Sequence, residues 1–109
     1  MVEYTYQIDQ LFFALSDSTR RNILEHVATA EMSIGEIARH YQLTFAGISK
    51  HIKVLERAGL VIKKRRGKEQ VVILVPESVE IAREHVERYA CMWNERYNKL
   101  EAILKEKEL

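Results

Sequence analysis

The chain has 109 residues, of which 47% are hydrophobic and 30% charged, a composition that fits one small globular domain and excludes a disordered chain. The formal net charge is +1, which by itself does not indicate a nucleic-acid partner. Residues 1–10 hold acidic side chains but no Lys or Arg, and no apolar run approaches the roughly 20 residues of a membrane span, so we expect neither a signal peptide nor membrane insertion. Because Cys91 is the single cysteine, an intrachain disulfide is excluded and a cytoplasmic protein is expected.

Charge is distributed unevenly along the chain. Residues 39–68 hold nine Lys or Arg and one acidic residue, Glu56, for a net charge of +8, whereas the remaining residues hold eight basic and fifteen acidic side chains, for a net charge of −7. Such segregation is typical of a segment that faces a polyanion. Charge alone would also fit a solvated charged surface.

The first two predicted elements are helices. Apolar residues recur at the i, i+3, i+4, i+7 spacing of one helix face over 8–15. Asp17 is a suitable N-cap for a second helix, because its carboxylate can accept free backbone N–H groups, and it opens a helical core over 17–58. Arg20 and Arg21 lie in the first turn of that helix, where positive charge opposes the helix dipole. We therefore expect little local structural reason for these arginines and predict that they contact phosphates.

A helix-turn-helix is predicted over 33–58. Ser33 and Glu36 form the Ser-x-x-Glu capping box that opens its first helix, and Thr44 can cap the second after a short turn. Gly59 ends the second helix, because glycine adopts the left-handed C′ conformation at little cost. In this arrangement the second helix enters the major groove of DNA.

The second helix of the motif has a predicted DNA-reading face, because its apolar positions turn the polar and small residues outward. Lys50 and Lys53 lie one turn apart and can reach the same phosphates or a guanine edge. Phe45 has two open interpretations, contact with a thymine methyl or packing against the preceding helix. His51 has no Cys or His at metal-ligand spacing and is interpreted as structural or close to phosphate. The predicted DNA contacts from this segment are Thr44, Phe45, Gly47, Ser49, Lys50, His51 and Lys53.

A β-hairpin is predicted over 60–75, where β-branched runs flank a charged stretch that contains Gly67. Its tip is strongly basic. A two-stranded ribbon with such side chains can reach a flanking phosphate or the minor groove. The predicted DNA contacts from the hairpin are Arg65, Arg66 and Lys68.

The last predicted helix covers 77–107, after Pro76, which suits a first helical position. Its apolar residues form a narrow stripe with steps of three and four. A helix of about 30 residues runs roughly 45 Å, longer than a domain this small can cover. We therefore expect the stripe to pack on a second copy of the chain rather than in its own core. The predicted dimer interface is Ile8, Leu11, Phe12, Tyr89, Trp93, Tyr97, Leu100 and Leu104.

Two stretches resemble ArsR-type winged-helix repressors: residues 13–24, FALSDSTRRNIL, and residues 43–61, LTFAGISKHIKVLERAGLV. The spacing of Ser49, His51 and Leu55 before the Ala-Gly-Leu-Val at 58–61 is the specific part of the resemblance. It implies a mainly α fold with a small β-hairpin, a single winged helix-turn-helix domain over 1–109 with a long C-terminal dimerisation helix. It also implies a homodimer that binds double-stranded DNA and represses transcription. In that family the first and last helices form the dimer interface, and the second motif helix and the wing contact DNA.

Many family members sense metals, and here the chain departs from the pattern. Residues 33–41 contain no Cys, and the Glu84, His85, Glu87 and Cys91 of the last helix lack the spacing of zinc-sensing members. We therefore expect no metal and no cofactor, while a cross-subunit metal or redox site at His85 or Cys91 stays open. No arrangement typical of a catalytic site is present, so an enzyme is not expected. Two alternatives remain, a protein-interaction module and a ligand-gated or metal-gated sensor.

Overall fold

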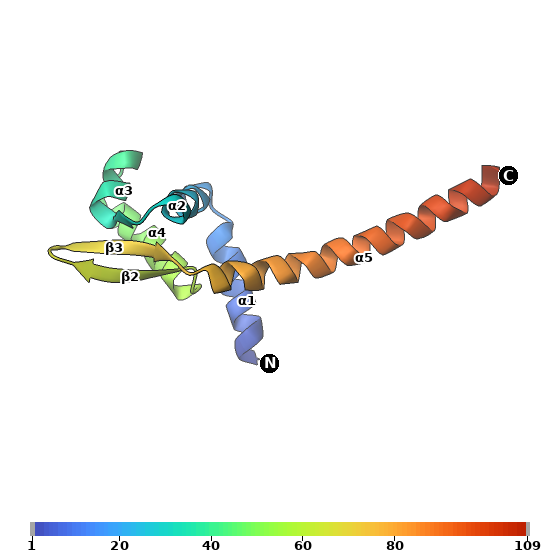
Figure 1. Ribbon diagram of the computed structural model, residues 1–109, viewed down its shortest axis with the longest axis horizontal. Helices are drawn as coiled ribbons and strands as arrows, with labels where there is room; N and C mark the ends of the chain where they lie inside the picture. The colour runs from blue at the N-terminus through green and yellow to red at the C-terminus, as the bar shows by residue number, and fades with distance from the viewer. Residues whose placement is uncertain (1, 109) are drawn as a thin grey trace.

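The computed structural model describes residues 2–108, and the side chains of residues 5–107. The helices and strands form a helical body with a small sheet on one side and a long helix leading away from it (Figure 1). Along the chain the elements are α1 (Val2–Leu15), α2 (Ser18–Thr29), β1 (Met32–Ser33), α3 (Ile34–Tyr41), α4 (Phe45–Arg57), β2 (Val61–Arg66), β3 (Glu69–Leu74) and α5 (Pro76–Glu108).

The hydrophobic core lies where α1 to α4 meet the sheet. Every helix of the body contributes apolar side chains with almost no exposed surface, and each such side chain stabilises the fold by about 1.5–3 kcal/mol. The largest fully buried apolar side chains are Leu11, Ile23, Ile37, Ile48, Ile52, Leu55, Leu60, Val61 and Val72. This core holds α3 and α4 in the helix-turn-helix arrangement expected from the sequence.

The predicted caps are confirmed. Asp17 Oδ2 accepts from the N–H of Arg20 at 3.1 Å, and Thr44 Oγ1 accepts from the N–H of Gly47 at 3.0 Å. At the start of α3, Ser33 Oγ accepts from the N–H of Glu36 at 3.1 Å, and the Glu36 carboxylate accepts in return from the N–H of Ser33 at 3.4 Å. These bonds satisfy N–H groups that have no partner inside their helices.

The end of α4 has the geometry predicted for Gly59. This glycine has φ +76°, its N–H donates to the Glu56 carbonyl at 3.0 Å, and the N–H of Leu60 donates to the Leu55 carbonyl at 3.0 Å. This pair of bonds is the Schellman motif. It reverses the chain so that Leu60 enters the core and β2 starts immediately afterwards.

The sheet contains one strand more than the sequence predicts. Strands β2 and β3 form the expected hairpin, with Val61 opposite Leu74 and Arg66 opposite Glu69, and Gly67 at its tip has φ +64°. Strand β1 pairs antiparallel with the other side of β3, so the order is β1-β3-β2. Because β1 has two residues, it is too short to show the alternation by which strands are recognised in a sequence.

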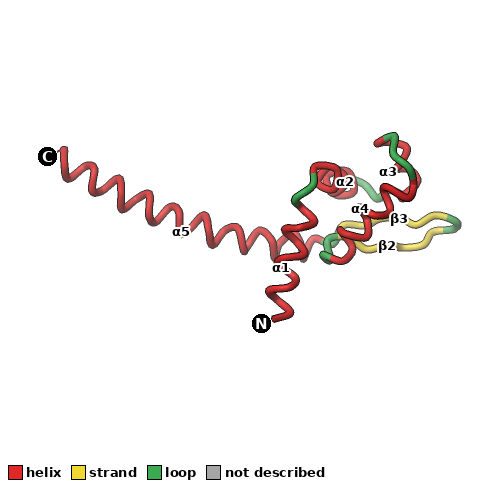
Figure 2. The backbone as a smooth tube through the Cα atoms, turned by 180° about the vertical axis from the view of Figure 1, so that it is seen from behind, coloured by secondary structure: helices red, strands yellow, loops and turns green. Residues whose placement is uncertain are grey.

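Helix α5 extends far beyond the body. Its 33 residues span about 50 Å at 1.5 Å per residue, which accounts for the 71 Å long dimension of the chain. Figure 2 shows that only its first turns lie against the body and that the rest runs free. Helix α1 also starts earlier than predicted, at Val2 rather than residue 8. Within residues 2–108 no helix is both long and apolar enough to cross a membrane.

We predict that Gly59→Ala lowers the free energy of unfolding by about 1–2 kcal/mol, because an L side chain is strained at positive φ. The added Cβ would also lie 3.3 Å from Ser78 Oγ. Gly35→Ala is the control, since the nearest atom to its Cβ is at 3.6 Å and Gly35 lies in a helix. Urea unfolding measures both variants. Equal midpoints for Gly59→Ala and the parent would contradict the expectation.

Candidate nucleic-acid interface

Helix α4 has one face in the core and one face in solvent. Ile48, Ile52 and Leu55 have no exposed surface, whereas four polar side chains on the other side of the helix are exposed or half-buried. We call this set the recognition face, which consists of Ser49, Lys50, Lys53 and Arg57. In the described part of the chain none of its three cations forms an ion pair. Arg57 was not among the predicted contacts, although its position four residues after Lys53 places it on the same face.

The start of α4 is open to solvent. Phe45 is 59% exposed, which favours contact with DNA over packing against α3 as the interpretation of this residue. Ala46 is exposed beside it, and Gly47 is half-buried. The first turn holds no acidic residue, so its N–H groups and the helix dipole favour an anion there.

Contrary to the expectation from the sequence, the arginines of α2 have a structural role within the chain. Arg20 is 8% exposed, and its Nε and Nη2 donate to the carbonyls of Ala14 at 2.8 Å and Phe13 at 3.0 Å. Arg21 Nη1 donates to the Leu15 carbonyl at 2.8 Å. The dipole of α2 disfavours both cations, but their side chains bind the C-terminal end of α1, where carbonyls lack partners and a cation is favoured. Arg21 is exposed and its phosphate contact stays a prediction, whereas the guanidinium of Arg20 is already bonded within the chain.

His51 faces this helix corner rather than open solvent. Its Nδ1 lies 3.4 Å from Arg20 Nη1 and 3.9 Å from Asp17 Oδ2. The backbone N–H of Arg20, followed by the positive charge of its guanidinium, lowers the pKa of Asp17. The cluster therefore connects α4 to the junction of α1 and α2, and it supports the structural interpretation of His51.

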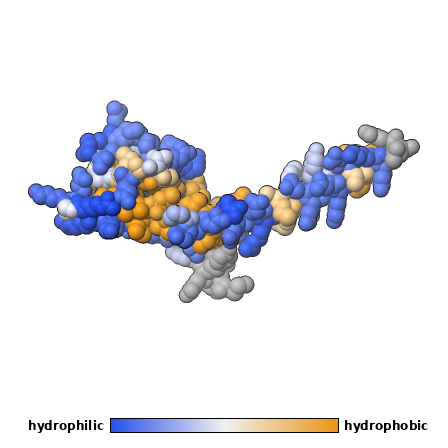
Figure 3. All heavy atoms as spheres, in the orientation of Figure 1, coloured by the Kyte–Doolittle hydropathy of each residue, from blue (hydrophilic) through white to orange (hydrophobic). Residues whose placement is uncertain are grey.

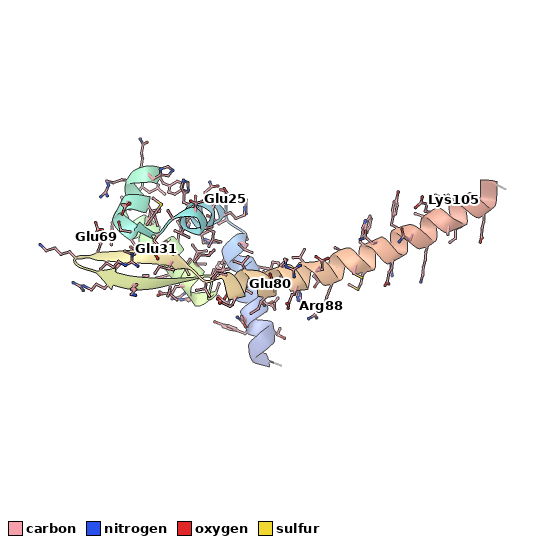
Figure 4. All side chains as sticks on the ribbon, in the orientation of Figure 1. Glu25, Glu31, Glu69, Glu80, Arg88 and Lys105 are labelled. Atoms are coloured by element: carbon pink, nitrogen blue, oxygen red, sulfur yellow. The ribbon has the colours of Figure 1, made fainter. Side chains whose placement is uncertain are left out.

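The wing, residues 60–75, carries its cations on β2 and at the tip. Lys64, Arg65 and Lys68 are exposed, and Arg65 Nε donates to the Gly67 carbonyl at 3.2 Å. Arg66 is exposed too, but its guanidinium pairs with the carboxylate of Glu31, which lies beside β3 in Figure 4. The predicted contacts of the wing are thus accessible, although the charge of Arg66 is partly balanced within the chain.

The predicted dimer residues differ in how far they are exposed. Ile8 and Leu11 are 7% and 0% exposed, so their assignment to the interface is wrong. The other side of α1 faces solvent and these residues complete the core of their own chain. Phe12 is half-buried, with its ring 5.7 Å from that of His85 on α5. The remaining predicted residues belong to an exposed row on α5 that we call the α5 stripe: Val86, Tyr89, Trp93, Tyr97, Leu100 and Leu104, each at least half exposed.

No three His, Cys, Asp or Glu side chains among the described residues are grouped closely enough to hold a metal ion. Cys91 is exposed. His85 Nε2 lies 3.2 Å from the hydroxyl of Tyr89, and its Nδ1 is buried without a hydrogen-bond partner. A cross-subunit site at either residue remains a prediction.

The arrangement of α3, α4 and the wing defines a winged helix-turn-helix DNA-binding protein. Residues 15–63 match a protein family described as a helix-turn-helix domain. Over 81 residues the chain is 35% identical to the HTH-type transcriptional regulator Rv2034 of Mycobacterium tuberculosis, covering 74% of this chain and 76% of that protein. It is also 35% identical over 60 residues to the transcriptional repressor SdpR of Bacillus subtilis, covering 55% of this chain and 67% of that protein.

Solved structures agree with these relatives. An ArsR-like transcriptional regulator from Rhodococcus sp. RHA1 superposes with a TM-score of 0.76 at 26% identity, covering 91% of this chain and 93% of that one. The homodimeric winged helix-turn-helix DNA-binding domain of Mb0332 from Mycobacterium bovis shares the fold, with a TM-score of 0.68 at 22% identity over 82% of each chain. The chain belongs to the ArsR-type winged helix-turn-helix family of DNA-binding transcriptional regulators, which confirms the predicted fold class and family.

We predict that Arg20→Gln lowers the free energy of unfolding by about 2–4 kcal/mol, because two charge-assisted hydrogen bonds to helix carbonyls are lost. Arg21→Gln, the matched control at the neighbouring exposed position, should change it by less than about 1 kcal/mol. Urea unfolding at neutral pH measures both. A similar midpoint for the two variants would show that Arg20 does not stabilise the helix corner.

Proposed function

We propose that the protein is a homodimeric repressor that binds a palindromic operator in double-stranded DNA. The observation that carries this proposal is the recognition face, whose cations are exposed and unpaired among the described residues on a helix that fits a major groove. The exposed N-terminus of α4, from Thr44 to Gly47, supports contacts with base edges and phosphates. Lys64, Arg65 and Lys68 of the wing support contacts with the flanking backbone.

The α5 stripe supports the homodimer. Six large apolar or aromatic side chains are at least half exposed along a helix that leaves the body, and monomeric proteins rarely expose such a surface. A second copy can cover the stripe by packing its own α5 alongside, with Phe12 at the edge of the contact. The homodimeric state of the Mb0332 domain supports the same assembly.

The exposed Arg21 of α2 is a further proposed phosphate contact, in addition to those of α4 and the wing.

Two-fold symmetry then sets the form of the operator. The two α4 helices would enter successive major grooves about 34 Å apart, which requires half-sites related by a dyad. Repression would follow because a dimer on a promoter excludes the polymerase, as the activity named for the relative SdpR suggests. Selection of bound duplexes from a random pool at physiological salt tests this part. Enrichment of sequences without dyad symmetry would contradict it.

We predict that Lys53→Glu weakens binding to any duplex by about tenfold or more at low salt, because affinity for the DNA backbone comes from cations that displace condensed counterions. The slope of log affinity against log salt should fall in magnitude by about one or more. Lys99→Glu, which makes the same charge reversal at an exposed position of α5, is the matched control and should leave the contacts of the recognition face with DNA unchanged. Fluorescence anisotropy of a labelled duplex measures both, and equal losses would assign the effect to net charge rather than to the recognition face.

We predict that Trp93→Ala combined with Leu100→Ala reduces the mass in solution from a dimer toward a monomer, because both side chains lie in the α5 stripe. Asn94→Ala combined with Asn98→Ala, on the polar side of α5, is the control and should keep the dimer mass. Light scattering at micromolar concentration measures the mass. An unchanged mass for the apolar pair would place the interface elsewhere.

A further inference from the structure

An apolar pocket of about 240 Å³ lies where α5 joins the body. Its walls come from the end of α1, the middle of α2, the base of the wing and the first turns of α5. The aliphatic wall residues are Leu15, Leu24, Leu60, Leu74, Val79 and Ala82. Figure 3 shows hydrophobic surface over this region, between the sheet and the root of α5. The volume is below the 300–1,000 Å³ usual for drug-sized ligands, which favours a slender chain over a ring system.

Glu25 is the one charged residue among those that line the pocket. It also lines a more open hollow of about 250 Å³, together with His26 and Thr29, so it stands on the ridge between the two. It lies on the outer side of α2 (Figure 4) and has no ion-pair partner among the described residues. Burial, followed by the negative charge of Glu25, raises the pKa of Tyr41.

The cation nearest along α2 is already engaged. Arg21, one helical turn before Glu25, donates to the Leu15 carbonyl and does not line the pocket. The ridge therefore places a negative charge beside an apolar pocket, and no cation among the described residues pairs with it. A ligand complementary to both parts has an apolar chain and a positively charged end.

We propose that this pocket, which we call the α5 pocket, binds a small amphiphilic cation with its alkyl chain among the aliphatic walls and its ammonium group over Glu25. The walls connect parts with different tasks, since Leu60 and Leu74 belong to the base of the wing and Val79 and Ala82 to α5. An occupant would therefore change how α5 meets the DNA-reading part of the chain. We also infer that occupancy of the pocket alters the affinity for DNA, because α5 would set the spacing of the two α4 helices in the dimer. This inference rests on the proposed function.

The binding test uses the full chain without DNA and three probes of equal length: octylammonium chloride, 1-octanol and sodium octanoate. We expect saturable binding of octylammonium by calorimetry, about fivefold tighter than octanol and about tenfold tighter than octanoate. These ratios are modest because an ion pair with an exposed carboxylate contributes little to affinity. Glu25→Gln should weaken binding of octylammonium and strengthen binding of octanoate, so that the three affinities come to lie within about twofold of one another. Ala28→Phe, which adds a ring at an exposed lining position of α2, should abolish binding of all three.

Ala102→Phe, an exposed position on the polar side of α5, is the control and should bind octylammonium as the parent does. Thermal unfolding shows whether each variant is folded, and light scattering should give the same mass for Ala28→Phe and the parent. No saturable binding, undiminished binding to Ala28→Phe, or preference for octanoate would overturn the proposal. A loss of dimer mass in Ala28→Phe would overturn it as well, because the pocket would then seat the second copy.

The regulatory part is measured separately, as the affinity of the parent for a labelled duplex with and without saturating octylammonium, with Ala28→Phe as the control for nonspecific effects. We expect a change of at least about fivefold in the parent and none in Ala28→Phe. Saturable binding without such a change would refute the coupling and leave the site. Failure to bind any duplex would instead refute the proposed function.

Discussion

The burial of one face of α4 determines how this protein presents its charge. Ile48, Ile52 and Leu55 are completely buried, and together they stabilise the folded state by about 5–9 kcal/mol at 1.5–3 kcal/mol each. The repulsion among Lys50, Lys53 and Arg57 in solvent is smaller, since exposed charge interactions contribute at most about 1 kcal/mol each. Hydrophobic burial therefore orients the helix, and the cations gather on the side that remains.

The corner beneath α4 is tied by polar contacts rather than by apolar packing. Arg20 satisfies carbonyls at the end of α1, while its own backbone N–H caps α2 through Asp17. His51 brings α4 to the same cluster. A buried guanidinium is tolerated because its hydrogen bonds to the carbonyls of Ala14 and Phe13 offset part of its desolvation cost. The recognition face is thus positioned from two sides, by the core and by this corner.

Helix α5 differs from α4, because among the described residues no other element covers the apolar side of its outer part. The first turns pack on the body through Ser78 and Ala82, which are both 7% exposed, and the α5 stripe begins where the body ends. A single chain therefore has a buried core around α4 and an exposed hydrophobic row along α5. The α5 pocket lies at the junction of these two regions, which is why an occupant there could influence both.

Local signals in the sequence determined where α2, α3 and α4 begin and where α4 ends. Asp17, Ser33, Thr44 and Gly59 act through backbone groups a few residues away, so their effects can be read from spacing alone. The recognition face followed from the same periodicity, and Arg57 could have been included by it. Only the tertiary structure decided the contacts between different elements. These contacts are the hydrogen bonds of Arg20 and Arg21 to the end of α1, the pairing of β1 with β3, and the burial of Ile8 and Leu11. Helical periodicity shows that a residue is on an apolar face, but which surface covers that face depends on where the other elements pack.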